Sequence, residues 1–218
     1  LNESDLNIGV SELVLKQFRE YPTYSPKDEV VLYNGVDTSK FYPIEVKKND
    51  IFTIGCIANF WEIKGQIALI KSVEFLSLEG KEILLRLIGS GPKLDECCNY
   101  VKDHNLESIV SFESEKKHSA LNIFYNDIDL FVLPSSYEAL GCVYLESWAT
   151  NTPFIGIEAQ GISELIPDHE KGNLLAVTQS VDSLKKKILA EYNRRRGFPF
   201  VSKYDIRSTI KEFVDNYL

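Results

Sequence analysis

The segment from Leu133 to Glu146 carries two glutamates eight positions apart, Glu138 and Glu146. Glu138 falls in a polar loop, whereas Glu146 falls in an otherwise apolar helix, where a carboxylate is costly unless it accepts hydrogen bonds. The paired hydroxyls of a ribose would supply such bonds, because one carboxylate can accept from both. A neighbouring backbone amide or an arginine would also satisfy Glu146, and the spacing alone leaves the two alternatives equal.

Between the two glutamates, Leu140, Gly141 and Cys142 stand at the expected start of that helix. The first amides of a helix have no partner within the helix, and the helix dipole makes this end positive. A diphosphate is a ligand that suits such an end.

Lys64 directly precedes Gly65 on a loop that leads into another predicted helix. An ammonium group in this place can reach an anion that the helix amides also bind. Taken by itself, the feature is more often an ordinary solvated lysine beside a helix start.

Two further loops contain glycine. Gly89-Ser90-Gly91-Pro92 allows the backbone to approach a ligand closely, although a plain tight turn explains it as well. This loop lacks the third glycine of the dinucleotide fingerprint and follows the second strand of the regular region, which argues against a nicotinamide or flavin site. In the segment Gln160 to Glu164, Glu164 either caps a helix or touches a ligand, and capping is favoured.

The elements that must position these residues alternate regularly from Ile51 onward. Short apolar runs alternate with amphipathic segments, which is typical of a parallel α/β sheet. Right-handed crossovers then predict a doubly wound, Rossmann-like sheet whose ligands bind at the carboxyl ends of the strands. The predicted strands are 51–58, 82–88, 108–112, 129–133, 153–157 and a short one at 173–176; the predicted helices are 65–78, 93–103, 119–126, 142–150, 163–166 and 181–195.

The two ends of the chain lie outside this alternation. Before it, the pattern predicts a strand at 5–10, a helix from Ser11 to about Glu20, a strand at 30–33 and a polar loop at 38–50. After it, a last helix is predicted at 203–218. The chain contains no methionine, from which we expect a piece of a longer protein.

Charge and cysteine content narrow the class of partner. A net charge of −8 argues against nucleic acid, because binding to its phosphates needs a basic face. The one dense basic cluster is interpreted as a solvated helix face, with an anionic membrane surface as the alternative. It consists of Lys185, Lys186, Lys187, Arg194, Arg195 and Arg196.

The four cysteines lack metal-ligand spacing and are expected to be buried or idle thiols in a reducing cytosol. They are Cys56, Cys97, Cys98 and Cys142. No apolar run approaches the 18 residues that predict a membrane-spanning helix.

In their order along the chain, these segments resemble the carboxyl-terminal, donor-binding domain of family 4 (group 1) retaining glycosyltransferases, which have the GT-B fold. The resemblance rests on VSELVLKQF, VLYNGVDTSKF, IGCIANFWEIKG, LIGSGP, FVLPSSYEALGCVYLESWA, PFIGIEAQGISELI, KGNLL and IRSTIKEFVDNYL. It implies that residues 1–50 are the end of an amino-terminal domain, the interdomain crossing and a linker. Residues 51–200 would form the nucleotide-sugar-binding domain, and 201–218 a helix that packs back toward a missing amino-terminal domain.

The resemblance also implies roles for single residues. Lys64 would stabilise the departing diphosphate, Glu138 would face the transferred sugar and Glu146 would hold the ribose hydroxyls. The other implied donor contacts are Asn59, Gly89, Gly91, the backbone near Phe112 at the base, and the amides of Leu140, Gly141 and Cys142.

Two positions depart from the family pattern. The family often has arginine in place of Asn59, so Lys64 and the helix dipole would carry more of the diphosphate charge. Many members have two glycines where this chain has Gln160-Gly161.

The implied reaction transfers a sugar from a UDP- or GDP-sugar to a hydroxyl group with retention of configuration, and without a metal or other cofactor. The acceptor, a glycan or a lipid-linked glycan, would bind mainly to the missing domain, so the isolated chain is expected to be inactive. A cytoplasmic location is expected, with attachment to the membrane surface as an alternative. Two other functions stay open: a nucleotide-sugar epimerase of similar architecture and a non-catalytic nucleotide- or glycan-binding module.

Overall fold

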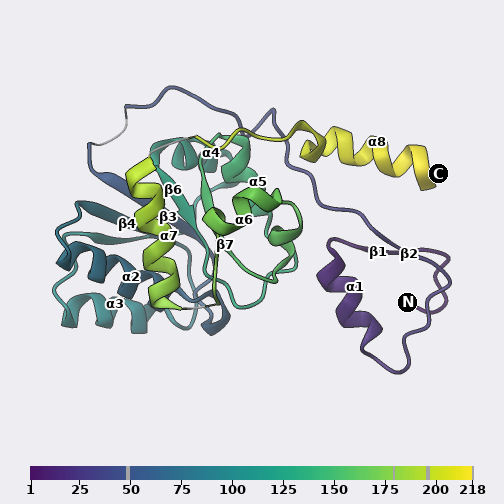
Figure 1. Ribbon diagram of the computed structural model, residues 1–218, viewed down its shortest axis with the longest axis horizontal. Helices are drawn as coiled ribbons and strands as arrows, with labels where there is room; N and C mark the ends of the chain where they lie inside the picture. Colours follow the sequence, from purple (N-terminus) through teal and green to yellow (C-terminus); the bar gives the residue numbers. More distant parts are fainter. Residues whose placement is uncertain (48–49, 179, 195–196, 218) are drawn as a thin grey trace.

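A six-stranded parallel sheet flanked by helices forms the larger part of the protein (Figure 1). The computed structural model describes residues 1–47, 50–178, 180–194 and 197–217. Along the sheet the strands lie in the order β5-β4-β3-β6-β7-β8. Their bounds are β3 Phe52–Ile57, β4 Ile83–Ile88, β5 Val110–Glu113, β6 Leu130–Val132, β7 Phe154–Ile157 and β8 Leu175–Ala176. The predicted doubly wound α/β fold is therefore confirmed.

The strands are apolar on both faces, which is what a parallel sheet covered by helices requires. Ile54, Leu85, Phe131 and Phe154 have no solvent-exposed surface. Along the chain, β3 is followed by β4 on one side of it, whereas β6 lies on its other side and is followed by β7. The direction of winding thus reverses between β3 and β6, and a sheet of this kind opens a crevice at the carboxyl ends of two such strands.

Six helices of the described chain accompany the sheet: α2 Gln66–Leu78, α3 Leu94–Asp103, α4 His118–Asp127, α5 Cys142–Ala149, α6 Asp168–Leu174 and α7 Val181–Arg194. Helix α2 packs against both α3 and α7, and α4 packs against α5. Because the winding direction reverses, right-handed crossovers place α5 on the opposite face from α2 and α3.

The first part of the chain forms a small unit of its own (Figure 1). Strands β1 (Asn7–Gly9) and β2 (Glu29–Val31) make a two-stranded parallel sheet, and α1 (Glu12–Arg19) lies between them in sequence. The Ser11 side chain accepts a hydrogen bond from the Val14 amide, which confirms Ser11 as the N-cap of α1.

The last helix, α8 (Ile206–Tyr217), is tied to the segment that leaves β2. Val36 forms an isolated parallel bridge with Asp205, and the Asp205 carboxylate accepts hydrogen bonds from Thr38 and Arg207. Beyond this anchor α8 runs alongside the first unit and away from the six-stranded sheet (Figure 1).

Three predicted elements differ most from the structure. The one-turn helix predicted at 163–166 is a 3-10 turn at Gly161–Glu164, and it is followed by α6, which was not predicted. The strand predicted at 173–176 is only Leu175–Ala176, because α6 extends to Leu174 and only two residues reach the edge of β7. The helix predicted at 203–218 begins at Ile206, because Asp205 has an extended backbone and its carboxylate accepts the Arg207 amide. Leu218 lies outside the described residues.

The basic cluster on α7 is largely paired. Lys185 forms an ion pair with Glu79, Lys187 donates to the Gly172 carbonyl, and Arg194 contacts Glu191. Arg195 and Arg196 lie outside the described residues. In the described ranges, no helix has the length and apolar character needed to cross a membrane.

Candidate functional site

A cleft of about 210 Å³ opens where β3 and β6 end. Its walls come from the end of β3, the loop after it, the residue after β6 and the start of α5. They are Ile57, Ala58, Asn59, Lys64, Leu133, Glu138, Gly141, Cys142 and Val143. The cleft therefore lies at the point where the winding of the sheet reverses, which is where ligands of such sheets bind. It contains five of the predicted site residues: Asn59, Lys64, Glu138, Gly141 and Cys142.

An ion pair crosses this cleft. The Lys64 Nζ lies 2.6 Å from Glu138 Oε2, and the two side chains are 19% and 18% exposed. Lys64 ends a single 3-10 turn, η1 (Glu62–Lys64), directly before α2. The structure thus brings together two residues that are 74 positions apart in the sequence.

The loop that carries Glu138 is fastened to the Lys64 loop on one side. The Ser136 amide donates to the Ile63 carbonyl at 2.7 Å, and the Ser135 hydroxyl reaches the same carbonyl at 3.2 Å. Ile63 is the neighbour of Lys64, so the two loops hold a fixed spacing. This spacing places the carboxylate and the ammonium in one cleft.

Gly141 stands between Glu138 and α5, with a φ of +77°. A Cβ at this position would lie 2.7 Å from the Tyr144 ring and 2.9 Å from the Glu138 Cγ. Glycine therefore satisfies both the left-handed backbone and the close approach of Glu138. Within the described chain, no side chain caps α5 at Gly141, so its first amides remain available as donors at the wall of the cleft.

Glu146 lies on α5 four residues after Cys142, which places both on one face of the helix about 6 Å apart along its axis. It is 8% exposed. Its Oε2 accepts a hydrogen bond from the Tyr125 hydroxyl at 2.8 Å, and its Oε1 lies 3.3 Å from the His118 Nε2. A tyrosine and a histidine thus satisfy this carboxylate, rather than the backbone amide or arginine considered from sequence.

The sequence patterns did not predict His118 or Tyr125 as part of the site. The available signal was the hydroxyl of Tyr125 next to the apolar Ile123 and Phe124, since a buried hydroxyl needs a partner. Burial and the neighbouring Glu146 raise the pKa of Tyr125 well above its ordinary value, so the hydroxyl remains a donor to Glu146.

Gly89 and Gly91 let the loop after β4 pack on the loop after β3. A Cβ at Gly91 would lie 2.7 Å from the Phe60 carbonyl oxygen, and one at Gly89 would collide with the Ala58 carbonyl oxygen. Close packing of the two loops therefore requires glycine at both positions. Phe112 packs against Phe60 next to this contact, with ring centroids 6.1 Å apart.

Glu164 caps a helix, as the capping interpretation expected, but the helix is α1 from the first unit. Its carboxylate accepts the amides of Glu12 at 2.8 Å and Leu13 at 3.0 Å, and the Tyr33 hydroxyl at 3.1 Å. Burial, together with Glu164, raises the pKa of Tyr33 to about 12. Glu164 lies at the end of η2 (Gly161–Glu164), so it joins the first unit to the large sheet.

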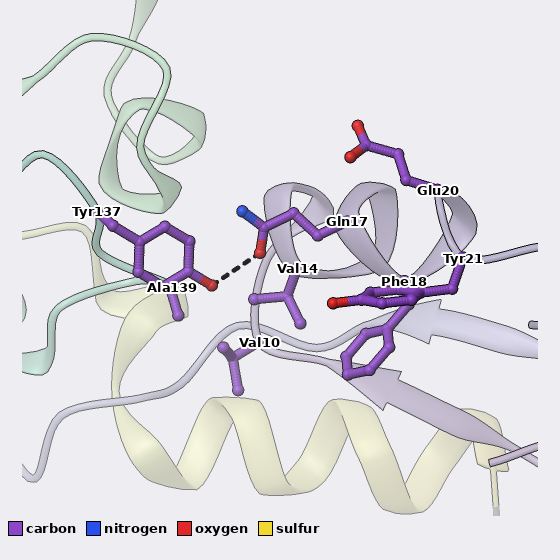
Figure 2. Close-up of a pocket in the computed structure, with 8 residues that line it drawn as sticks. All are labelled: Val10, Val14, Gln17, Phe18, Glu20, Tyr21, Tyr137 and Ala139. Carbon is purple, nitrogen blue, oxygen red and sulfur yellow. Dashed lines mark hydrogen bonds between the residues drawn. The ribbon is translucent and has the colours of Figure 1, made fainter.

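A second and larger cavity, of about 870 Å³, lies between α1 and the Glu138 loop (Figure 2). Val10, Val14, Gln17, Phe18, Glu20 and Tyr21 line it from the first unit, and Tyr137 and Ala139 line it from the loop. The Tyr137 hydroxyl donates to Gln17 Oε1 at 2.8 Å (Figure 2). Residues 137 and 139 thus face this cavity, whereas Glu138 between them faces the smaller cleft.

Comparison with known proteins decides the family of the chain. Residues 37–195 match the family model described as "Glycosyl transferases group 1". The chain belongs to the group 1 glycosyltransferase family. A curated relative of this glycosyltransferase domain is the putative glycosyltransferase EpsF of Bacillus subtilis, which is 32% identical over 161 residues. That alignment covers 68% of the chain and 39% of EpsF.

Solved structures support the same architecture. Sucrose-phosphate synthase from Thermosynechococcus elongatus superposes on all of the chain and on 58% of its own length, with a TM-score of 0.85 and 19% identity. Anabaena HepE, solved in complex with UDP and glucose, covers 97% of the chain and 62% of itself, with a TM-score of 0.81 and 17% identity. At these identities the likeness establishes the fold, which is that of the GT-B glycosyltransferases. The chain spans half or less of the length of the curated relatives it matches, from 34% to 50%.

Proposed function

We propose that this domain binds a nucleoside-diphosphate sugar in the cleft after β3 and β6, as the donor of a glycosyl transfer that retains the anomeric configuration. One observation carries the proposal: the Lys64 ammonium and the uncapped amino end of α5 converge on one cleft at the winding reversal of the sheet. The HepE structure, which contains UDP and glucose on the same fold, supports the choice of ligand class.

The cleft after β3 and β6 suits the diphosphate alone. Its 210 Å³ is less than the roughly 300–1,000 Å³ of sites that enclose a drug-sized ligand. The ribose would lie along α5 at Glu146, and the base beyond it near the Gly89–Gly91 loop and Phe112. The transferred sugar would lie at Glu138.

The groups in the cleft fit the charge changes of such a reaction. When the bond from sugar to phosphate breaks, negative charge grows on the leaving diphosphate and positive charge grows on the sugar ring. Donors aimed at the diphosphate interact more strongly as its charge develops, which lowers the barrier. Lys64 and the first amides of α5 would supply this stabilisation, and the Glu138 carboxylate would face the positive ring.

The acceptor half of the site would come from a further domain that packs against the first unit and α8. Two parallel strands alone rarely form a stable sheet. Moreover, Ile8, Phe18 and Tyr21 of this unit are 45%, 37% and 64% exposed, and Ile210 and Val214 of α8 are 55% and 47% exposed. We propose that the first unit and α8 complete that domain, with the rest of residues 1–50 as the crossing and linker. A glycan or lipid-linked acceptor would enter between the two halves, and transfer would occur in the cytoplasm.

A calorimetric panel of UDP, GDP, ADP and their sugar derivatives on the 218-residue chain tests donor binding. One base should bind and raise the melting temperature by about 5–10 °C at a hundredfold excess over Kd. Lys64→Ala should remove most of this shift. Lys185→Ala should leave it unchanged, because Lys185 lies on α7 and pairs with Glu79 at the end of α2. Binding of no nucleotide, or equal shifts for both variants, would overturn the proposal.

A further inference from the structure

Gln160 joins the turn after β7 to the loop that carries Glu138. Its side chain is buried and makes two hydrogen bonds to that loop. The Oε1 accepts the Glu138 amide at 2.8 Å, and the Nε2 donates to the Ser136 carbonyl at 3.0 Å. The Gly161 amide adds a third bond, to the Glu138 carbonyl at 3.1 Å.

The turn that presents Gln160 is held in an uncommon conformation. Ala159, directly before it, has a φ of +57°. A left-handed backbone is costly for alanine and persists where the surroundings impose it. The turn then enters η2, which begins at Gly161 and ends at the capping residue Glu164.

The Glu138 loop is therefore held from two sides. On one side, Ser135 and Ser136 donate hydrogen bonds to the Ile63 carbonyl next to Lys64. On the other side, the Gln160 side chain bonds to the Ser136 carbonyl and to the Glu138 amide. A loop without helical or strand hydrogen bonds has few other ways to fix a carboxylate. Loss of the Gln160 amide would leave the Glu138 amide and the Ser136 carbonyl without these partners, so residues 136–138 would rearrange.

We propose that Gln160 is a positioning residue, which sets the Glu138 carboxylate against the sugar of the donor. The inference rests on the proposed function, because it assumes that the sugar lies at Glu138. It concerns the sugar: the diphosphate would be bound by Lys64 and the first amides of α5, whereas the two hydrogen bonds of the Gln160 side chain go to the Glu138 loop.

The test compares two ligands of the same chain by calorimetry: the nucleoside diphosphate that the wild type binds and its sugar derivative, UDP with UDP-glucose or GDP with GDP-mannose. In the wild type the sugar should tighten binding. In Gln160→Ala the sugar derivative should lose about tenfold in affinity relative to the diphosphate, whose own affinity should not fall. Gln160→Met, which keeps the size of the side chain but neither hydrogen bond, should behave in the same way.

Asn126→Ala is the matched control. Asn126 is also a buried amide; its Oδ1 accepts the Ile44 amide at 2.9 Å and its Nδ2 donates to the Tyr42 carbonyl at 3.1 Å. It lies before β6, at the other end of the sheet. Its loss should lower stability without changing the affinity ratio of the two ligands.

The possible outcomes separate the two proposals. A wild type that binds neither ligand contradicts the proposed function. A wild type that binds the diphosphate and gains nothing from the sugar overturns the positioning role, as does a Gln160→Met variant with the wild-type ratio. If Asn126→Ala also lowers the affinity for the sugar derivative relative to the diphosphate, the effect comes from reduced stability, and the positioning role of Gln160 is overturned.

Discussion

Lys64 and Glu138 are bound to each other across the cleft, with 2.6 Å between Nζ and Oε2. The two side chains that we propose to act on opposite ends of the scissile bond thus form one ion pair, shielded from solvent on most sides. A diphosphate that binds the Lys64 ammonium must compete with the Glu138 carboxylate. When the diphosphate displaces Glu138 from Lys64, the freed carboxylate can face the sugar. Donor binding and rearrangement of the pair are therefore linked.

Removing the charge of Glu138 should strengthen diphosphate binding. In Glu138→Gln the ammonium no longer has a carboxylate partner, and an ion pair of this exposure contributes about 1 kcal/mol, which corresponds to roughly a fivefold change in Kd. Calorimetry with the nucleoside diphosphate should show this gain in affinity. A weaker Kd for the diphosphate would contradict the competition between the two ligands of Lys64.

Substitution of Glu146 should weaken binding of the nucleoside part of the ligand and leave binding of the phosphates unchanged. In Glu146→Gln, the charge-assisted bonds to a ribose weaken, and nucleoside diphosphate affinity should fall about tenfold. Inorganic pyrophosphate, which has no ribose, should bind the variant and the wild type alike. Equal losses for both ligands, measured by competition calorimetry, would show that Glu146 acts through the position of α5 instead.

Substitution of Gly141 should cost more stability than its left-handed backbone conformation alone explains. Gly141→Ala places a left-handed alanine, which costs about 1–2 kcal/mol, and adds clashes with Tyr144 and Glu138. Gly80→Ala is the control, because Gly80 has a φ of +80° with no atom within 4 Å of an added Cβ. Urea unfolding should show a larger loss of stability for Gly141→Ala, and only this variant should lose diphosphate binding.

The attachment of α8 should weaken in acid. The hydrogen bonds from Arg207, with that from Thr38, hold the pKa of Asp205 well below the ordinary 3.8. The folded chain thus binds fewer protons at Asp205 than the unfolded chain, so this stabilisation is present above about pH 4 and is lost as the pH falls further. The free energy of unfolding, measured with urea between pH 6 and 3, should fall less steeply with decreasing pH for Asp205→Asn than for the wild type. Asp215→Asn, exposed on the same helix, should follow the wild type.

Much of the fold is determined locally in the sequence. Apolar runs such as 52–57 and 154–157 are short, bounded by turn residues and suited to strands buried on both faces, so they predict a parallel sheet without knowledge of any contact. The order of strands and helices then places Lys64, Glu138 and the start of α5 at one edge of the sheet, because the carboxyl ends of parallel strands share that edge.

Only the tertiary structure decided which residues touch there. Three of these contacts join residues that are far apart in the sequence. Lys64 pairs with Glu138 over 74 positions, Gln160 bonds to Glu138 over 22, and Glu164 caps α1 at Glu12 over 152. From the sequence, Glu146 could have bonded to an amide or an arginine. Its partners are Tyr125 and His118 because α4 packs against α5. Hydrophobic periodicity is a local property of the chain, whereas the partner of a buried polar group depends on which distant segments folding brings beside it.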